Sequence, residues 1–163
     1  MRLTKFSDYA FRVLLIAANR PDRRTTIEET AELYGISAAH LKKVVLLLSR
    51  AGYLEGVRGR SGGFSLAKPA EEINLGAVLR LTEPDFGMVE CFLPGNTCPI
   101  TRVCALPAVI NAALEAFVAT FDQYTLADIQ LNDAHHFTQH LGGRQQPVRG
   151  PHLQDAPPRR DEG

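Results

Sequence analysis

The stretch that decides the fold is TTIEETAELYGISAAHLKKVVLLLSRAG, which occupies residues 25–52. Its first half reads as a short helix, because Thr25 and Glu28 have the spacing of a capping box, in which each side chain bonds the other residue's backbone amide. The helix is predicted to run to about Tyr34. Gly35 then permits the sharp turn that ends it, since glycine adopts left-handed backbone angles without steric cost.

The second half predicts another helix directly after that turn. Ser37 is a suitable N-cap, and Gly52 marks the end of the helix. The apolar residues of this segment recur at helical spacing and form one stripe: Leu41, Val44, Val45 and Leu48. Two short helices joined by a glycine turn predict a helix-turn-helix, although a simple helical hairpin would give a similar pattern.

The sequence YLEGVRGRSGGFSLAKP follows at once and predicts a β-hairpin with a glycine-rich tip. Gly59, Gly62 and Gly63 are expected to allow positive φ angles at this tip. Arg58 and Arg60 lie on the same tip and suit contacts with phosphates or with the minor groove of DNA. A basic hairpin in this place indicates the wing of a winged helix, and a plain surface hairpin is the alternative.

The chain has no formal net charge, but its charges are divided along the sequence. Residues 1–70 contain 12 Lys and Arg against 6 Asp and Glu, whereas residues 71–130 contain 2 against 8. Residues 131–163 contain 4 of each. This division favours a polyanion, double-stranded DNA, as the partner of the first part, although an ordinary dipolar surface would also show it.

Candidate DNA contacts lie mainly on the second helix of the helix-turn-helix. The residues on its exposed or N-terminal part are expected to contact bases or phosphates: Ala38, Ala39, His40, Lys42 and Lys43. Ser37 and Thr26 are expected to be phosphate contacts or helix caps. Arg58 and Arg60 of the wing complete the predicted DNA-binding set.

Three further helices are predicted, at residues 5–19, at 74–83 with Asn74 as N-cap, and at 106–124 with Pro107 in the first turn. The last of them has a wide apolar face: Leu106, Ile110, Ala113, Leu114, Phe117, Val118 and Phe121. A second copy of the chain would bury this face and give a two-fold dimer, which matches a palindromic DNA operator. The alternative is that the helix packs only on its own domain.

All three cysteines lie in one loop, CFLPGNTCPITRVC, residues 91–104. Cys91, Cys98 and Cys104 are separated by six and then five residues. Zinc sites pair cysteines about two to four residues apart, so the wider spacing favours a larger iron–sulfur cluster. Cys104 directly precedes the long helix, whose positive end favours a thiolate. One disulfide with one free thiol is the alternative, although the odd number of cysteines argues against it.

Several of these motifs together resemble one family, the Rrf2-type winged-helix regulators, over roughly residues 1–130. The matching runs are LTKFSDYAFRVL, YGIS, VRGRSGGFSLAKP, FDQYTLADI and the three-cysteine loop. The resemblance implies a mostly α fold with a small β-wing, a winged helix-turn-helix followed by a long dimerisation helix. It also implies a homodimer that holds one iron–sulfur cluster per subunit on Cys91, Cys98 and Cys104. The cluster type is expected to be [4Fe-4S], with [2Fe-2S] as the alternative.

The resemblance further suggests the fourth cluster ligand. In family members with a [4Fe-4S] cluster, this position is similar to the aspartate of the FSDY motif, here Asp8, supplied by the other subunit. From the local sequence alone, Asp8 would only favour the N-terminus of its helix, and Glu90 is a second candidate. The family's regulators of cluster assembly have a histidine three residues after the last cysteine, where this chain has Pro107.

The expected function is therefore a transcriptional repressor that senses nitric oxide and releases DNA when its cluster is nitrosylated. A regulator of the same fold that responds to cluster status or thiol oxidation is one alternative, and an iron–sulfur carrier is another. The sequence contains no recognisable pairing of a nucleophile with a base and no phosphate-binding loop. Nothing in it therefore indicates an enzyme.

The predicted organisation has three parts: a DNA-binding domain at 1–70, a cluster loop and dimerisation helix at 71–130, and a disordered tail at 131–163. The tail is poor in large apolar residues and rich in proline and glycine. No apolar run approaches the roughly 20 residues of a membrane span, and no signal peptide precedes the first helix. The chain is expected to be cytoplasmic, without a membrane partner.

Overall fold

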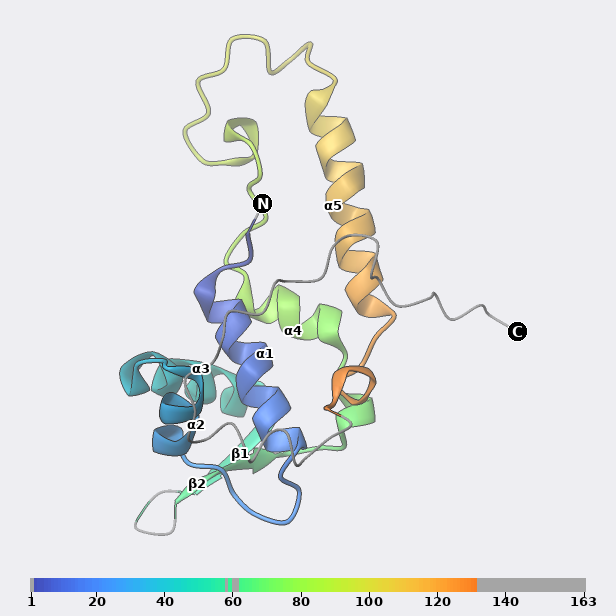
Figure 1. The fold of residues 1–163 in the computed structure, drawn as a ribbon. Coiled ribbons are helices and arrows are strands. Elements are labelled where there is room, and N and C mark those ends of the chain that lie inside the picture. The colour runs from blue at the N-terminus through green and yellow to red at the C-terminus, as the bar shows by residue number, and fades with distance from the viewer. Residues whose placement is uncertain (1, 58, 60–61, 132–163) are drawn as a thin grey trace, which may run out of the picture.

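The structure, a computed structural model, describes residues 2–57, 59 and 62–131 (Figure 1). It is mostly helical, with one small antiparallel sheet. The longer elements are α1 (Lys5–Ala18), α2 (Ile27–Tyr34), α3 (Ala38–Arg50), β1 (Leu54–Val57), β2 (Gly63–Leu66), α4 (Leu75–Thr82) and α5 (Leu106–Asp122). Three short 3₁₀ turns are η1 (Ala70–Glu72), η2 (Glu90–Phe92) and η3 (Ala127–Ile129).

Helix α1 is the centre of the packing. It contacts α3, α4 and β2, and Figure 1 shows it between the α2–α3 pair and α4. Its side chains Val13, Leu14 and Ile16 are fully buried. Burying one such side chain contributes about 1.5–3 kcal/mol, so this burial supplies most of the stability of the helix. The position of α1 therefore fixes how the DNA-binding helices lie relative to α4.

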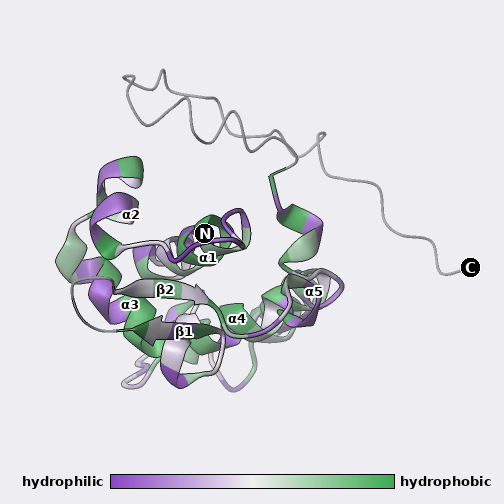
Figure 2. Cartoon of the chain, turned by 90° about the horizontal axis from the view of Figure 1, so that it is seen from below, coloured by the Kyte–Doolittle hydropathy of each residue, from purple (hydrophilic) through white to green (hydrophobic). Residues whose placement is uncertain are grey.

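Helices α2 and α3 form the predicted helix-turn-helix. Gly35 has φ 62° at the end of α2, so the turn has the left-handed backbone that the sequence predicts. Leu41, Val44 and Leu48 of α3 are fully buried. In Figure 2 both helices change from hydrophilic to hydrophobic around their axes, as expected for helices with one buried face.

The predicted capping box of α2 is wrong by one residue. Thr26, rather than Thr25, accepts a hydrogen bond from the Glu29 amide at 3.1 Å, and Glu29 accepts one from the Thr26 amide at 2.9 Å. Thr25 is used elsewhere: its backbone pairs with that of Phe64, through bonds of 2.9 and 2.8 Å. Its side chain is fully buried, so it is not free to cap the helix.

Strands β1 and β2 form the base of the wing, with Leu54 opposite Leu66 and Val57 opposite Gly63. The bridge between Thr25 and Phe64 adds the stretch before α2 to the edge of this sheet. Gly63 is required there, because its φ is 151° and a side chain would begin 2.8 Å from the Thr25 carbonyl oxygen. Gly59 also has a positive φ, of 113°.

The expectation of a positive φ at Gly62 is wrong. In the described part of the tip, only Gly59 and Gly63 have one. Position 62 has no room for a side chain, because a Cβ atom there would lie 2.6 Å from the carbonyl oxygen of Val57. Arg58 and Arg60 lie outside the described residues.

Helices α4 and α5 are joined by polar contacts near the end of α5. Asn74 caps α4 by accepting from the Ala77 amide at 2.9 Å, as predicted, and donates to the carbonyl oxygen of Asp122 at 2.7 Å. Arg80 donates to both carboxylate oxygens of Asp122, at 2.6 and 2.5 Å. Hydrogen bonding from this guanidinium lowers the pKa of Asp122. These contacts fasten only the C-terminal end of α5.

The rest of α5 extends away from the domain, with the cysteine loop at its far end (Figure 1). Of the 17 residues of the helix, only Val118 is buried in the described chain. Leu106 and Val109 are 54% and 64% exposed. The predicted apolar face of α5 is only partly open: its own domain covers the C-terminal part around Val118 and Phe121, and the N-terminal part around Leu106 stays exposed.

The predicted fold class, mostly α with a small β-wing, is confirmed. Pro107 lies in the first turn of α5, as expected. None of the described helices is long and apolar enough to cross a lipid bilayer. The predicted disordered tail, apart from the exposed Leu131 at its start, lies outside the described residues.

Candidate functional site

The outward face of α3 is the candidate nucleic-acid interface. Its exposed residues recur every three or four positions and so share one face of the helix: Ala39, Lys42, Lys43, Leu46 and Arg50. His40 is also exposed, beside this face, and Ala38 is half-buried. The structure therefore brings the predicted contacts of α3 to one basic surface next to the wing.

Thr26 and Ser37 are the two residues that were predicted either to cap a helix or to contact a phosphate. Thr26 is engaged as the N-cap of α2. Ser37 occupies the N-cap position of α3, but its hydroxyl makes no capping bond within the described helix. Because Ser37 is also exposed, a phosphate contact is the role that its position leaves open.

Glu29 holds α2 in place beside this interface. Its carboxylate lies 2.9 Å from Arg23 and 3.7 Å from Arg20. The hydrogen bond from Arg23, and after it the one from the Thr26 amide, lower the pKa of Glu29 to about 2, against the opposing effect of partial burial. The negative charge of Glu29 therefore helps to hold the N-terminus of α2 in place.

We expect Glu29→Gln to destabilise the fold by up to about 1 kcal/mol at pH 7, the upper range for exposed ion pairs. Because the pKa of Glu29 falls from 4.5 to about 2 on folding, its contribution is complete above about pH 4.5 and disappears as the pH falls to about 2. Urea unfolding across this range should show the two proteins converging at low pH. Glu28→Gln is the control, and a stability difference independent of pH would contradict the assignment.

The three cysteines lie in the segment between α4 and α5. Cys91 is in the 3₁₀ turn η2, Cys98 lies directly before the turn that begins at Pro99, and Cys104 lies two residues before α5. All three are free thiols of intermediate exposure, so the alternative of one disulfide with one free thiol has no support in the described structure.

Local hydrogen bonds shape this loop. Cys98 donates its amide to the Asn96 side chain at 3.0 Å, and its carbonyl oxygen accepts from the Thr101 hydroxyl at 2.9 Å. Glu90 accepts from the amide and the hydroxyl of Thr97 at 3.3 and 3.0 Å. Glu90, the second candidate for the fourth ligand, therefore already has two hydrogen bonds to Thr97 within the loop.

Asp8 lies in the first turn of α1 and is paired with Arg12 one turn later. The two side chains are joined at 2.9 and 3.1 Å and are 44% and 41% exposed. The Arg12 guanidinium lies 5.5 Å from the centre of the Tyr34 ring, and the Tyr34 hydroxyl donates to the Arg12 carbonyl oxygen at 3.4 Å. Burial raises the pKa of Tyr34. Asp8 is therefore connected through Arg12 to the last residue of α2.

The first residue of the segment between α4 and α5 is fastened to the same end of α1. Thr4, the N-cap of α1, donates its amide and its hydroxyl to one carboxylate oxygen of Glu83, at 2.9 and 3.2 Å. Glu83 directly follows α4 and leads into the loop. Sequence reasoning missed this contact, and the pairing of Arg12 with Tyr34, because both depend on how separate helices pack. The sequence indicates only the pairing of Asp8 with Arg12, through their spacing of four residues on one helix face.

The donor set fits an iron–sulfur cluster in kind, since thiolates are its usual ligands. The Asp8 carboxylate keeps lone pairs beyond those used by Arg12 and is partly exposed. The described structure does not, however, gather three metal-binding side chains at one point. The three cysteines share a loop without converging, so ligation would require this loop to close.

A helix-turn-helix with a basic outward face, a β-wing and a long uncovered helix define a winged-helix transcriptional regulator. The chain belongs to the Rrf2 family, described as iron-dependent transcriptional regulators, whose model matches residues 3–132. It is similar to the HTH-type transcriptional regulator NsrR of Bacillus subtilis, with 48% identity over 81% of this chain and 92% of that protein. NsrR of Geobacillus kaustophilus is 47% identical over 79% of this chain and 89% of its own length.

Solved structures show the same fold. The IscR structure from T. potens has a TM-score of 0.63 at 21% identity and covers 79% of this chain and 85% of its own. The structure of CymR, the global cysteine regulator of B. subtilis, has a TM-score of 0.59 at 23% identity over 79% of this chain and 95% of its own. The family match and the NsrR relatives identify the chain as a transcriptional regulator rather than an enzyme, as predicted.

Proposed function

We propose that this chain is a homodimeric transcriptional repressor that binds a palindromic DNA operator and releases it in response to nitric oxide. In this proposal Cys91, Cys98 and Cys104 hold one iron–sulfur cluster per subunit, [4Fe-4S] rather than [2Fe-2S], with the partner subunit's Asp8 as fourth ligand. The observation that supports the proposal is the Thr4–Glu83 contact, which fastens the N-terminus of α1 to the end of α4, where the segment that carries the three cysteines begins.

The protein residues would transmit the state of the loop as follows. Holding the three thiols together would fix the segment between α4 and α5, and Glu83, the first residue of that segment, holds the N-terminus of α1. Helix α1 packs directly on α3, and Arg12 connects it to the end of α2. The orientation of the DNA-binding face therefore depends on how α1 is held at its N-terminus.

Bound iron would supply a position at which nitric oxide binds and displaces protein ligands, the carboxylate oxygen before the thiolates. A displaced Asp8 has a partner ready, because Arg12 of its own helix pairs with it. This pairing favours the released state, as a two-state switch requires. The two DNA-binding faces then lose the spacing that two half-sites demand.

The parts of the chain divide accordingly. Residues 1–70 form the DNA-binding unit, and residues 71–130 supply the ligands and the dimer contact. The uncovered face of α5, with exposed Leu106 and Val109, is the surface we assign to the second copy.

The test uses protein purified without oxygen and a short duplex that it selects from a random-sequence library, called here the selected duplex. We expect iron and sulfide in equal amounts, visible charge-transfer absorption, and binding to the selected duplex that graded nitric oxide abolishes. Absorption reports the state of the cluster, and fluorescence anisotropy reports binding to the duplex. Iron-free protein that binds equally tightly would overturn the proposal.

Asp8→Asn should keep iron, because the three thiols remain, but should shift the absorption spectrum and alter the response to nitric oxide. Asp22→Asn, an exposed residue in the turn after α1, is the control. If Asp8→Asn and wild type agree in both readouts, Asp8 serves only its pair with Arg12.

A thiol redox switch on the same fold is the second candidate. The free, half-exposed state of all three cysteines favours it, since accessible thiols are the ones that oxidise. It predicts operator binding without iron that responds to peroxide. An iron–sulfur carrier, the third candidate, would hold iron but select no duplex.

A further inference from the structure

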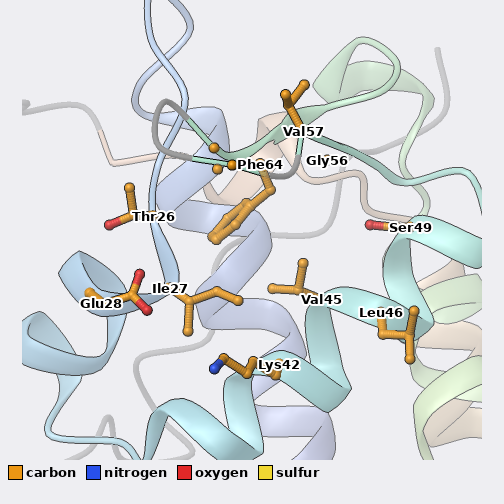
Figure 3. A pocket seen from close by; sticks show the side chains of 13 residues that line it. Thr26, Ile27, Glu28, Lys42, Val45, Leu46, Ser49, Gly56, Val57 and Phe64 are labelled. Carbon is orange, nitrogen blue, oxygen red and sulfur yellow. The ribbon is translucent and has the colours of Figure 1, made fainter.

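A groove of about 500 Å³ lies between α3, the N-terminus of α2 and the wing. Figure 3 shows Ile27, Val45 and Phe64 directed toward its middle, with Leu46 and Val57 at its edges. Leu46 and Val57 are 48% and 45% exposed. Two large apolar side chains are therefore open to solvent on the side of the domain that carries the basic residues.

Leu46 belongs to the DNA-facing surface of α3 and not to its buried stripe. Ala39, Lys42, Lys43 and Leu46 follow the spacing i, i+3, i+4 and i+7. The recognition helix of homeodomains uses this spacing to bring four side chains to base edges in the major groove. Lys42, Lys43 and Arg50 surround Leu46 with positive charge, which favours the phosphates on either side of a groove. Glu28 is the one acidic residue lining the groove, on its α2 side.

We infer that Leu46 is a specificity-determining residue that contacts the 5-methyl group of a thymine. The thymine methyl is the apolar group that DNA presents in the major groove. The lysines one turn before Leu46 can bond only to acceptors, because an ammonium group has no lone pair. The basic surroundings select DNA as the occupant over an apolar protein partner. The inference rests on the proposed binding of DNA.

Deoxyuridine tests this contact, because it differs from thymidine only in lacking the methyl group. Each thymine of the selected duplex is replaced in turn, and affinities are measured by fluorescence anisotropy at constant salt. At one thymine per half-site, wild type should lose about fourfold in affinity, the equivalent of about 0.8 kcal/mol for one buried methyl-sized group. Leu46→Ala should bind the thymine duplex about as weakly as wild type binds the deoxyuridine duplex.

The decisive result is the coupling between the two changes. Leu46→Ala should show no further loss on deoxyuridine substitution, whereas Leu131→Ala, a control with 46% exposure of its leucine, should keep the fourfold loss. If no substitution affects wild type, or if Leu46→Ala retains the loss, the inference is wrong. Failure to select any duplex would instead refute DNA binding itself.

Discussion

Replacing Cys98 with serine should remove the iron from the protein and lower its affinity for the selected duplex about 1000-fold, to the level of non-specific binding. The effect is large because the proposed dimer reads two half-sites at a fixed spacing, and that spacing would depend on the closed cysteine loop. A dimer that loses it keeps only its sequence-independent phosphate contacts.

The local geometry makes Cys98 the most informative of the three cysteines. Its amide and carbonyl groups are held by Asn96 and Thr101, and neither bond uses the thiol. Serine should therefore leave the turn intact, so that a loss of function reports the sulfur atom alone.

Arg102→Ala, an exposed position in the same loop, is the control and should retain both iron and binding. Iron content, circular dichroism and anisotropy on the same preparations separate loss of the cluster from loss of the fold. A serine variant that keeps its iron, or that binds the selected duplex as wild type does, would refute the ligand role of Cys98.

In the proposed homodimer, Val109→Lys should convert the dimer into a monomer. Val109 is 64% exposed and lies one turn after Leu106, which is 54% exposed. An unpaired charge buried at this contact should cost at least about 3 kcal/mol, which raises the dissociation constant of the dimer roughly a hundredfold or more. Analytical ultracentrifugation over a range of concentrations measures this shift.

Asn111→Lys supplies a matched control on the same helix. Asn111 faces away from Val109 and bonds to Glu115 at 2.6 Å, so a lysine there retains an acidic partner. This variant should remain a dimer. If both variants dimerise like wild type, α5 is not the dimer contact, and the two-fold arrangement of half-sites needs another surface.

The helix-turn-helix could be predicted from the sequence because its signals are local. The apolar stripe of α3 and the glycine at position 35 each specify their own geometry. The capping box of α2 shows the limit of this reasoning. Both Thr25 and Thr26 have a glutamate three residues later. The choice between them depends on Phe64, a residue of the wing whose backbone bonds to that of Thr25, and on Arg23, which pairs with Glu29.

The candidate site divides in the same way. The shared loop of the three cysteines is visible in the sequence, but the contacts that connect it to the DNA-binding helices, such as Thr4 with Glu83, join residues 79 positions apart. Leu46 is absent from the predicted DNA contacts, which lie on the exposed or N-terminal part of α3. The structure adds it, because the packed domain leaves its side chain 48% exposed.

The bridge between Thr25 and Phe64 gives the wing two attachments, one along the chain from α3 and one through the stretch before α2. A change in the length of the tip between Val57 and Gly63 would leave both attachments untouched. The length of the tip can therefore change without moving the base of the wing relative to α3.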